Sequence, residues 1–287
     1  MRKNRTYQTA AAFRTALENR LANIAATENV DLQRLRRQVA FDRLLARLGS
    51  ISNSPWVLKG GYAMELRFQK ARTTKDLDFT LRFKTKRVPG GDEVLDLVQG
   101  AAASDLGDFF TYQIGEATAD LDGAPYGGAR YPVIAVLADR TFARFHLDIG
   151  IGDVVIEPAE IFHSRDWLSF AQIPPATITA ISREQQFAEK IHAYTLPRTR
   201  NPNSRVRDLV DMVLLVGSNQ LDPEKTREAI LATYSRRSTH PVPALLQNPP
   251  TVWEKPFVAL AAECGLQIGI DEAFRVVDIF FRSLRMS

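Results

Sequence analysis

Cysteine and histidine are scarce in this 287-residue chain, which contains one cysteine, Cys264, and four scattered histidines. A single cysteine excludes an internal disulfide framework and suits a reducing cytoplasm. So few Cys and His residues also leave little material for a structural zinc site. No apolar run approaches the ~18 residues that a membrane helix requires. No apolar stretch follows the basic N-terminal residues, so we expect a cytoplasmic protein without a signal peptide or a membrane span.

The positive charge is concentrated in two parts of the chain. The net charge is only +4, and the 45% hydrophobic and 24% charged content is ordinary for a globular protein. Arginine dominates the basic residues near the N-terminus, and its guanidinium binds phosphate well. Such patches fit a polyanionic partner, although a solvated helix face explains any one residue equally well. The basic residues are Arg2, Lys3, Arg5, Arg14, Arg20, Arg34, Arg36, Arg37, Arg43 and Arg47, and then Arg198, Arg200, Arg205 and Arg207.

Hydrophobic periodicity predicts an α+β protein with a central mixed sheet. We expect an N-terminal helical segment (1–54), a core (55–175) and a C-terminal helical lobe (176–287). Residues 8–49 show helical spacing of apolar residues, and helices are also expected over 62–68, 93–106, 183–194 and 206–216. Strands are expected over 56–58, 77–83, 109–114, 131–137 and 143–151. The sequence contains no internal repeat and no low-complexity tract.

Asp76, Asp78 and Asp148 are the main candidates for a metal site. Strand side chains alternate, so Asp76 and Asp78 project from one face while Leu77 and Phe79 point the other way. Asp148 lies on the polar face of a second alternating strand. If the two strands are neighbours, three carboxylates converge, and such a cluster requires a cation. We therefore predict that they bind Mg²⁺ or Mn²⁺ and a nucleoside triphosphate, with Asp148 also helping to activate an attacking hydroxyl. The alternative is that Asp78 or Asp148 is an ordinary exposed strand residue.

Two further groups of residues are candidates for phosphate binding. Gly60-Gly61 lets backbone N–H groups approach a phosphate at the start of a helix, or simply makes a tight strand–helix turn. Lys190 lies mid-helix and could neutralise triphosphate charge. On the next helix Arg207 and Asp211 are four residues apart and can share a face. A salt-bridge network that holds two helices together, including Asp208, is the alternative.

Five sequence blocks in this order resemble the AbiEii/AbiGii (MenT-like) nucleotidyltransferase toxins of the DNA polymerase β-type superfamily. They are residues 58–67, 72–79, 147–150, 189–191 and 207–211. The resemblance implies catalytic positions at Asp76, Asp78, Lys190 and Asp211, and we predict nucleotide binding by Lys59, Gly60, Gly61, Arg72 and Arg207. It further implies a toxin that adds nucleotides, typically pyrimidines, to the tRNA 3′ acceptor end and so stops translation. A cognate antitoxin protein is implied as a partner.

Two other hypotheses are open at this point. The same chemistry could act on a protein or a small molecule, although the basic patches disfavour a small cationic acceptor. A nucleic-acid-binding or scaffold protein with a degenerate centre is the third hypothesis. The presence of all three carboxylates argues against it.

Overall fold

The computed structural model describes residues 6–51, 53–82, 87–121, 123–197 and 205–286. The chain forms two compact units, which are described separately. The sheet unit comprises Met1–Leu58, Lys75–Gly152 and Ile161–Ala180. The helical unit comprises Lys59–Thr74, Asp153–Glu160 and Ile181–Ser287.

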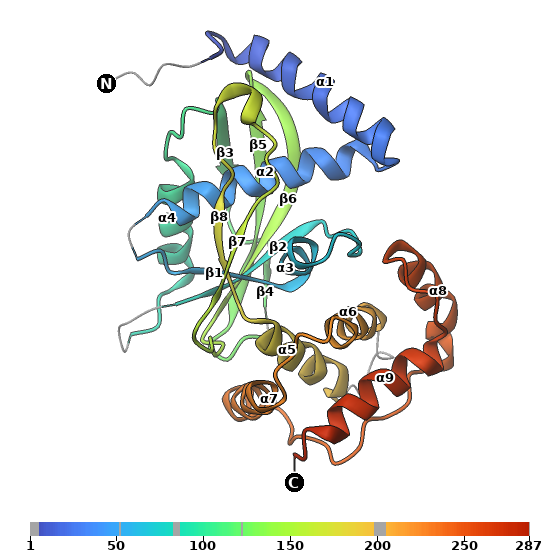
Figure 1. Cartoon of the computed structure of the whole chain (residues 1–287). Helices are drawn as coiled ribbons and strands as arrows, with labels where there is room; N and C mark the ends of the chain where they lie inside the picture. Colours follow the sequence, from blue (N-terminus) through green and yellow to red (C-terminus); the bar gives the residue numbers. More distant parts are fainter. Residues whose placement is uncertain (1–5, 52, 83–86, 122, 198–204, 287) are drawn as a thin grey trace. The chain divides into compact units, whose positions relative to one another are not determined.

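An eight-stranded mixed sheet forms the centre of the sheet unit, with the order β3-β5-β6-β2-β1-β8-β7 and β4 paired to β5 (Figure 1). Strand β2 runs parallel to β6, and β1 runs parallel to β8. Strand β5 is antiparallel to β3, β4 and β6. The strands are β1 (Trp56–Lys59), β2 (Asp76–Leu81), β3 (Phe110–Ile114), β4 (Ala119–Asp120), β5 (Gly128–Leu137), β6 (Arg140–Ile151), β7 (Glu160–His163) and β8 (Thr177–Ala180).

Helices cover the sheet through apolar side chains. Helix α2 (Leu32–Gly49) packs against β6 and β8, and also against α1 (Ala10–Glu28) and α4 (Gly91–Ala102) (Figure 1). Phe41 of α2 meets Phe145 of β6 edge to face at 4.8 Å between ring centroids. Both rings are almost fully buried, so this contact joins the helical layer to the strand that carries Asp148.

The single helical pattern expected over residues 8–49 is divided into two helices. Asn29 adopts a left-handed conformation (φ 52°) at the end of α1, a geometry that asparagine tolerates better than most residues. Asp31 then begins α2, because its side chain accepts a hydrogen bond from the backbone N–H of Arg34. Residues 29–31 therefore divide the helical segment expected over 8–49 into α1 and α2.

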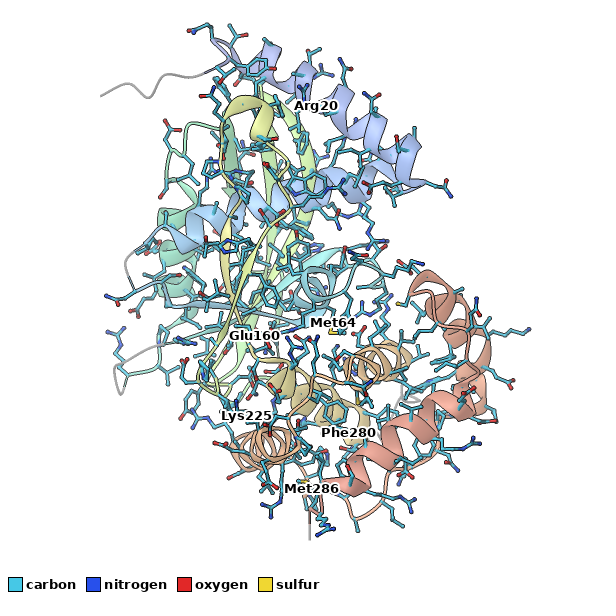
Figure 2. All side chains as sticks on the ribbon, viewed as in Figure 1. Arg20, Met64, Glu160, Lys225, Phe280 and Met286 are labelled. Atoms are coloured by element: carbon cyan, nitrogen blue, oxygen red, sulfur yellow. The ribbon has the colours of Figure 1, made fainter. Side chains whose placement is uncertain are left out.

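The helical unit has its own apolar core. The helices of this unit are α3 (Gly60–Arg67), α5 (Arg183–Thr195), α6 (Val206–Gly217), α7 (Pro223–Arg237), α8 (Glu254–Glu263) and α9 (Ile270–Ser283). Helix α5 packs against α6 and α7, and α6 packs against α8 and α9. Met64 lies in this core and Phe280 packs against it; both are labelled in Figure 2. The Phe280 ring meets Phe187 of α5 edge to face at 5.3 Å.

The predicted fold class is confirmed: a mixed sheet is accompanied by N-terminal helices and a C-terminal helical lobe. Three short strands, β4, β7 and β8, were not expected from the sequence. Phe83, the last residue of the strand expected over 77–83, lies outside the described residues. The division at residues 54 and 175 stays a prediction. Within the described part of the chain, no helix combines the length and apolar character needed to cross a membrane.

Candidate active site

Strand pairing places three carboxylates together in the sheet unit. In the parallel ladder between β2 and β6, Asp78 lies beside Asp148 and Asp76 lies beside His146. Neighbouring strands are about 4.8 Å apart, and residues side by side in a ladder project from the same face. Asp76, Asp78 and Asp148 therefore occupy one face, as the sequence pattern requires for a shared site.

Arg130 of β5 lies among these carboxylates. It is the register partner of Asp148 in the antiparallel β5–β6 ladder. Its Nε and Nη2 donate to the two oxygens of Asp148 at 2.7 and 2.6 Å, and Nη2 is 3.7 Å from Asp76. The hydrogen bond to Asp148 and the negative charges of the three aspartates raise the pKa of Arg130. His146 Nδ1 is 3.1 Å from the Asp76 carboxylate.

The donor chemistry of this cluster fits a divalent metal ion. Carboxylate oxygens are the ligands that Mg²⁺ and Mn²⁺ prefer. In the conformation described, however, no three or more His, Cys, Asp or Glu side chains among the described residues are arranged so that they could hold a metal ion. Arg130 supplies the positive charge beside Asp148 in this arrangement. A metal ion bound there would require the guanidinium to move away from the carboxylates.

The glycine pair begins helix α3 of the helical unit. Gly60 has φ 65°, a conformation open to glycine and strained for other residues. A Cβ atom on Gly61 would lie 2.7 Å from Thr74 Oγ1, so the absence of a side chain allows this close packing. The amide of Gln186 donates to the Gly60 carbonyl at 2.8 Å. The glycines thus form the first turn of the helix, two residues before the helix start expected from the sequence.

Lys190 and Asp211 meet inside the helical unit. Lys190 Nζ of α5 donates to Asp211 of α6 at 2.6 Å and to Asp208 at 3.2 Å. Asp211 has no exposed surface and also accepts from Arg72 Nε and Nη2 at 3.0 and 2.8 Å. Burial alone would raise the pKa of Asp211, but the charges of Lys190 and Arg72 lower it. Arg207, expected to share a face with Asp211, lies exposed on α6, and Arg72 pairs with Asp211.

Lys59 belongs to a second buried ion network in the helical unit. Its ammonium pairs with Asp153 and lies 3.7 Å from Glu189. Arg237 donates to Asp153 at 3.0 and 2.9 Å. Burial opposes the charged form, yet the charges of Glu189 and Asp153 raise the pKa of Lys59. This network therefore surrounds Lys59, the residue immediately before the glycine pair.

Comparison with known proteins places these features in a family. Residues 43–271 match the family model described as "Nucleotidyl transferase AbiEii toxin, Type IV TA system". The chain belongs to the AbiEii nucleotidyltransferase toxin family. It is therefore a nucleotidyltransferase toxin of the type IV toxin–antitoxin class, and this class implies an antitoxin partner. Nucleotidyltransferases use nucleoside triphosphates and divalent metal ions.

A solved structure shares the fold of this AbiEii family member, and a second gives a weaker match. MenT4, a nucleotidyltransferase toxin from Mycobacterium tuberculosis H37Rv, superposes with a TM-score of 0.56 at 17% identity, covering 93% of this chain and 96% of MenT4. JHP933 from Helicobacter pylori matches with a TM-score of 0.45 at 18% identity, covering 89% of this chain and 96% of that one. No curated protein sequence matches the chain.

Several N-terminal arginines of this toxin-family chain are structural. Arg43 and Arg47 both bind Asp108, at 2.7 and 2.6 Å, and all three residues are buried. Arg14 donates to three backbone carbonyls, those of Leu137, Arg140 and Thr141. Arg43 and Arg47 are therefore neither available to a polyanionic partner nor part of a solvated helix face, the two alternatives considered for each arginine. Arg2, Lys3, Arg5, Arg198 and Arg200 lie outside the described residues.

Arg130 and His146 are the residues of the carboxylate face that the sequence interpretation missed. Both lie on strands, and their proximity to Asp76 and Asp148 depends on the register of β5 and β2 against β6. A possible signal was the arginine placed immediately before the apolar run 131–137. The alternation of His146 with Phe145 and Leu147 was the second signal.

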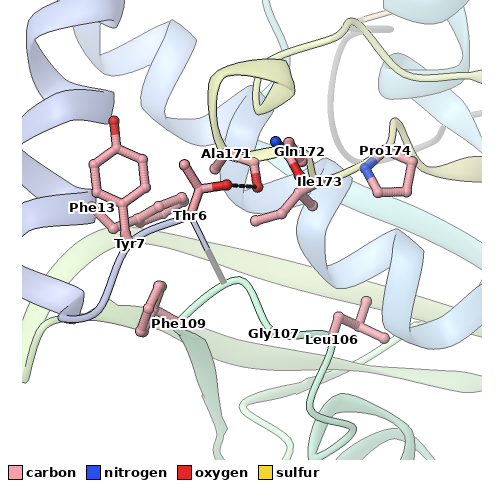
Figure 3. A pocket seen from close by; sticks show the side chains of 10 residues that line it. All are labelled: Thr6, Tyr7, Phe13, Leu106, Gly107, Phe109, Ala171, Gln172, Ile173 and Pro174. Carbon is pink, nitrogen blue, oxygen red and sulfur yellow. Dashed lines mark hydrogen bonds between the residues drawn. The ribbon is translucent and has the colours of Figure 1, made fainter. Parts of the chain in front are cut away.

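A separate pocket of about 300 Å³ lies in the sheet unit (Figure 3). Tyr7, Phe13 and Phe109 contribute aromatic rings to its lining. The Thr6 hydroxyl donates to the Ala171 carbonyl at 3.3 Å across one side of it. None of the candidate catalytic or nucleotide-binding residues lines this pocket.

Proposed function

We propose that this toxin transfers a nucleoside monophosphate from a nucleoside triphosphate, preferably a pyrimidine one, to the 3′ acceptor end of tRNA and thereby blocks translation. The observation that supports this best is the β2–β6 register, which sets Asp78 beside Asp148 in a chain of a nucleotidyltransferase toxin family. The tRNA acceptor and the pyrimidine preference come from the family resemblance of the sequence blocks. A cytoplasmic location agrees with this acceptor.

In this proposal Asp76, Asp78 and Asp148 would hold the divalent cation, Mg²⁺ or Mn²⁺. When bound, the metal neutralises phosphate charge and stabilises the transition state. The oxygen of the terminal ribose hydroxyl forms a bond to the α-phosphorus, and the bond from the α-phosphorus to the bridging oxygen breaks. Pyrophosphate leaves, and the hydroxyl proton passes to the carboxylate of Asp148. Phosphoryl transfer of this kind depends mostly on positioning and charge stabilisation.

The helical unit supplies candidate residues for the nucleotide. Gly60 and Gly61 begin α3, and the N-terminus of a helix favours a phosphate group. Lys190 supplies a positive charge that Asp211 holds in place, so we assign Asp211 a positioning role that acts through Lys190. Arg72 and Lys59 contact buried carboxylates, and they would help to hold the glycine turn and Lys190 in position beside the nucleotide. Arg207, which is exposed on α6, would bind phosphate directly.

Transfer is tested by incubating the purified protein with total tRNA, Mg²⁺ and each radiolabelled nucleoside triphosphate in turn. Asp76→Ala and Asp148→Asn are expected to lower labelling of tRNA by more than about a hundredfold. Loss of a group that only orients a metal ligand costs up to about a hundredfold, and loss of a direct ligand should cost more. Asp120→Asn is the matched control, because it removes an exposed carboxylate on β4. It should leave labelling unchanged.

The distribution of the label decides among the hypotheses. Label on tRNA from CTP or UTP supports the proposal. Equal labelling from ATP and GTP contradicts the pyrimidine preference. Label on protein or on a small molecule, identified by mass spectrometry, would establish the alternative acceptor class. Absence of label from every acceptor would contradict nucleotidyl transfer.

A further inference from the structure

A side chain of the protein itself supplies positive charge to the carboxylate face in this structure. Arg130 donates to both oxygens of Asp148 and lies 3.7 Å from Asp76. A guanidinium that engages both oxygens of a carboxylate occupies the lone pairs that a metal ion would take in two-oxygen coordination, and its positive charge repels a cation at the remaining ones. Arg130 and a metal ion therefore cannot both bind Asp148 in this way.

We propose that Arg130 and a divalent metal ion are alternative occupants of the Asp76/Asp148 carboxylates, so that metal binding displaces the Arg130 guanidinium. This inference rests on the proposed metal-binding role of these aspartates. It assigns a new role to Arg130, which regulates how readily the site accepts the metal.

The exposure of Arg130 makes the exchange feasible. Its side chain is 37% exposed, whereas those of Arg47 and Arg72, two arginines that make two-point contacts with fully buried carboxylates, are 1% and 10% exposed. A partly exposed guanidinium can return to water at low cost, and partly exposed ion pairs contribute little net stability. A buried guanidinium would lose its only strong partners. Arg130 is thus the arginine of the three that can leave its carboxylate without disrupting the fold.

The local backbone fixes Arg130 beside the metal ligands. Gly128, two residues earlier on β5, pairs with Gly150, and a Cβ at Gly128 would lie 2.3 Å from the Ile149 carbonyl oxygen. This close approach holds β5 against β6 next to Asp148. The guanidinium can therefore swing between the carboxylates and water while its Cα position stays fixed by the strand.

Isothermal titration of Mn²⁺ into the protein, without nucleotide or tRNA, tests the exchange. We expect Arg130→Met to bind Mn²⁺ about tenfold more tightly than the wild type, because the metal no longer displaces a charged hydrogen-bonded partner. Arg130→Lys, which keeps one positive charge but not the two-point contact, should bind with intermediate affinity. Asp148→Asn should bind more weakly than the wild type.

Arg165→Met is the matched control. Arg165 makes a two-point contact with Glu28 in the same unit, at 2.9 and 2.5 Å, and is similarly exposed at 46%. This variant should bind Mn²⁺ as the wild type does. If Arg130→Met binds Mn²⁺ no more tightly than the wild type, or if neither binds it, the exchange is contradicted.

A second measurement follows the guanidinium directly. In an NMR titration with diamagnetic Mg²⁺, the Nε–H resonance of Arg130, assigned by its loss in Arg130→Lys, should move towards the position of a solvated arginine. A resonance that stays in place while Mg²⁺ binds would overturn the displacement. Neither measurement involves nucleotide transfer, so failure of the exchange is distinguishable from failure of the proposed tRNA activity.

Discussion

Asp211 accepts hydrogen bonds from both Nε and Nη2 of Arg72, the shortest from each at 3.0 and 2.8 Å, although 139 residues separate them in the chain. The same carboxylate accepts from Lys190 and has no exposed surface. A carboxylate enclosed in this way cannot contact a substrate. Any effect of Asp211 on the proposed reaction would pass through the two cations that it holds, which is why we propose a positioning role for it.

Asp211→Asn should destabilise the protein strongly. The substitution leaves the buried charges of Lys190 and Arg72 without their shared anion, and breaking a buried ion pair costs about 3–5 kcal/mol. Thermal or urea denaturation measures this loss. Asp208→Asn is the control, because Asp208 contacts Lys190 at the longer distance of 3.2 Å and is 13% exposed; it should cost about 1 kcal/mol. Equal effects of the two variants would contradict the central role of Asp211.

His192 should make stability fall as the pH is lowered from 6.5. Burial, with the charges of Arg237 and His240, lowers the pKa of His192 to about 3. A depressed folded pKa means that the unfolded chain binds the proton first, so stability is present above the unfolded value of about 6.5 and is lost as the pH falls. Between pH 6.5 and 5 this single group should cost about 2 kcal/mol.

Urea unfolding at pH 6.5 and 5 measures the contribution of His192. The glutamine side chain in His192→Gln can still hydrogen-bond Thr239. In this variant the loss of unfolding free energy between pH 6.5 and pH 5 should be smaller than in the wild type by most of the contribution of His192. The burial of His240 lowers its pKa as well, so a smaller dependence should persist in the variant. An unchanged loss in His192→Gln would show that other groups produce the pH dependence.

Gly61→Ala should destabilise the helical unit by about 1–3 kcal/mol. The added methyl group would lie 2.7 Å from Thr74 Oγ1 and 2.9 Å from Thr74 Cβ. Gly100→Ala is the matched control within α4, since a Cβ there meets no atom within 4 Å. That change should stabilise the protein by about 0.5–1 kcal/mol, the usual gain of alanine over glycine in a helix. Thermal denaturation of both variants measures the contrast.

Arg47→Met should lower the free energy of unfolding by about 3–5 kcal/mol, because it removes the main partner of the fully buried Asp108. Arg87→Met removes an 81% exposed guanidinium that pairs with Glu93, and such surface pairs contribute about 0–1 kcal/mol. Chemical denaturation of both variants gives the comparison. If Arg47→Met retained wild-type stability, the structural role that we give this arginine would be wrong.

The sequence alone predicted those features of the fold that depend on local periodicity. The alternation of apolar residues over 77–83 and 143–151 predicted the two strands that the structure bounds at Asp76–Leu81 and Arg140–Ile151. It also indicated the face on which Asp76, Asp78 and Asp148 lie. The fold class followed from the same patterns. The roles of these residues stay predictions until the transfer and metal-binding measurements are made.

The features that the sequence did not predict depend on contacts between distant segments. Arg130 meets Asp148 only because β5 returns beside β6 in one particular register. Helical spacing allows Arg207 and Asp211 to share a face, but tertiary packing brings Arg72 from another segment to Asp211. Arg72 is therefore the arginine that pairs with Asp211. The break at Asn29 rests on a single left-handed residue within an otherwise continuous helical pattern.

The parallel pairing of β2 with β6 also sets the order in which this toxin can become complete during synthesis. Antiparallel neighbours can form as a hairpin leaves the ribosome, but β2 must wait for β6, with His146 following Asp76 by 70 residues. A nascent chain that ends before Arg140 carries Asp76 and Asp78 without the strand that supplies Asp148. A growing chain therefore has no assembled carboxylate face until β6 is made, and N-terminal fragments that end before Arg140 cannot form this arrangement.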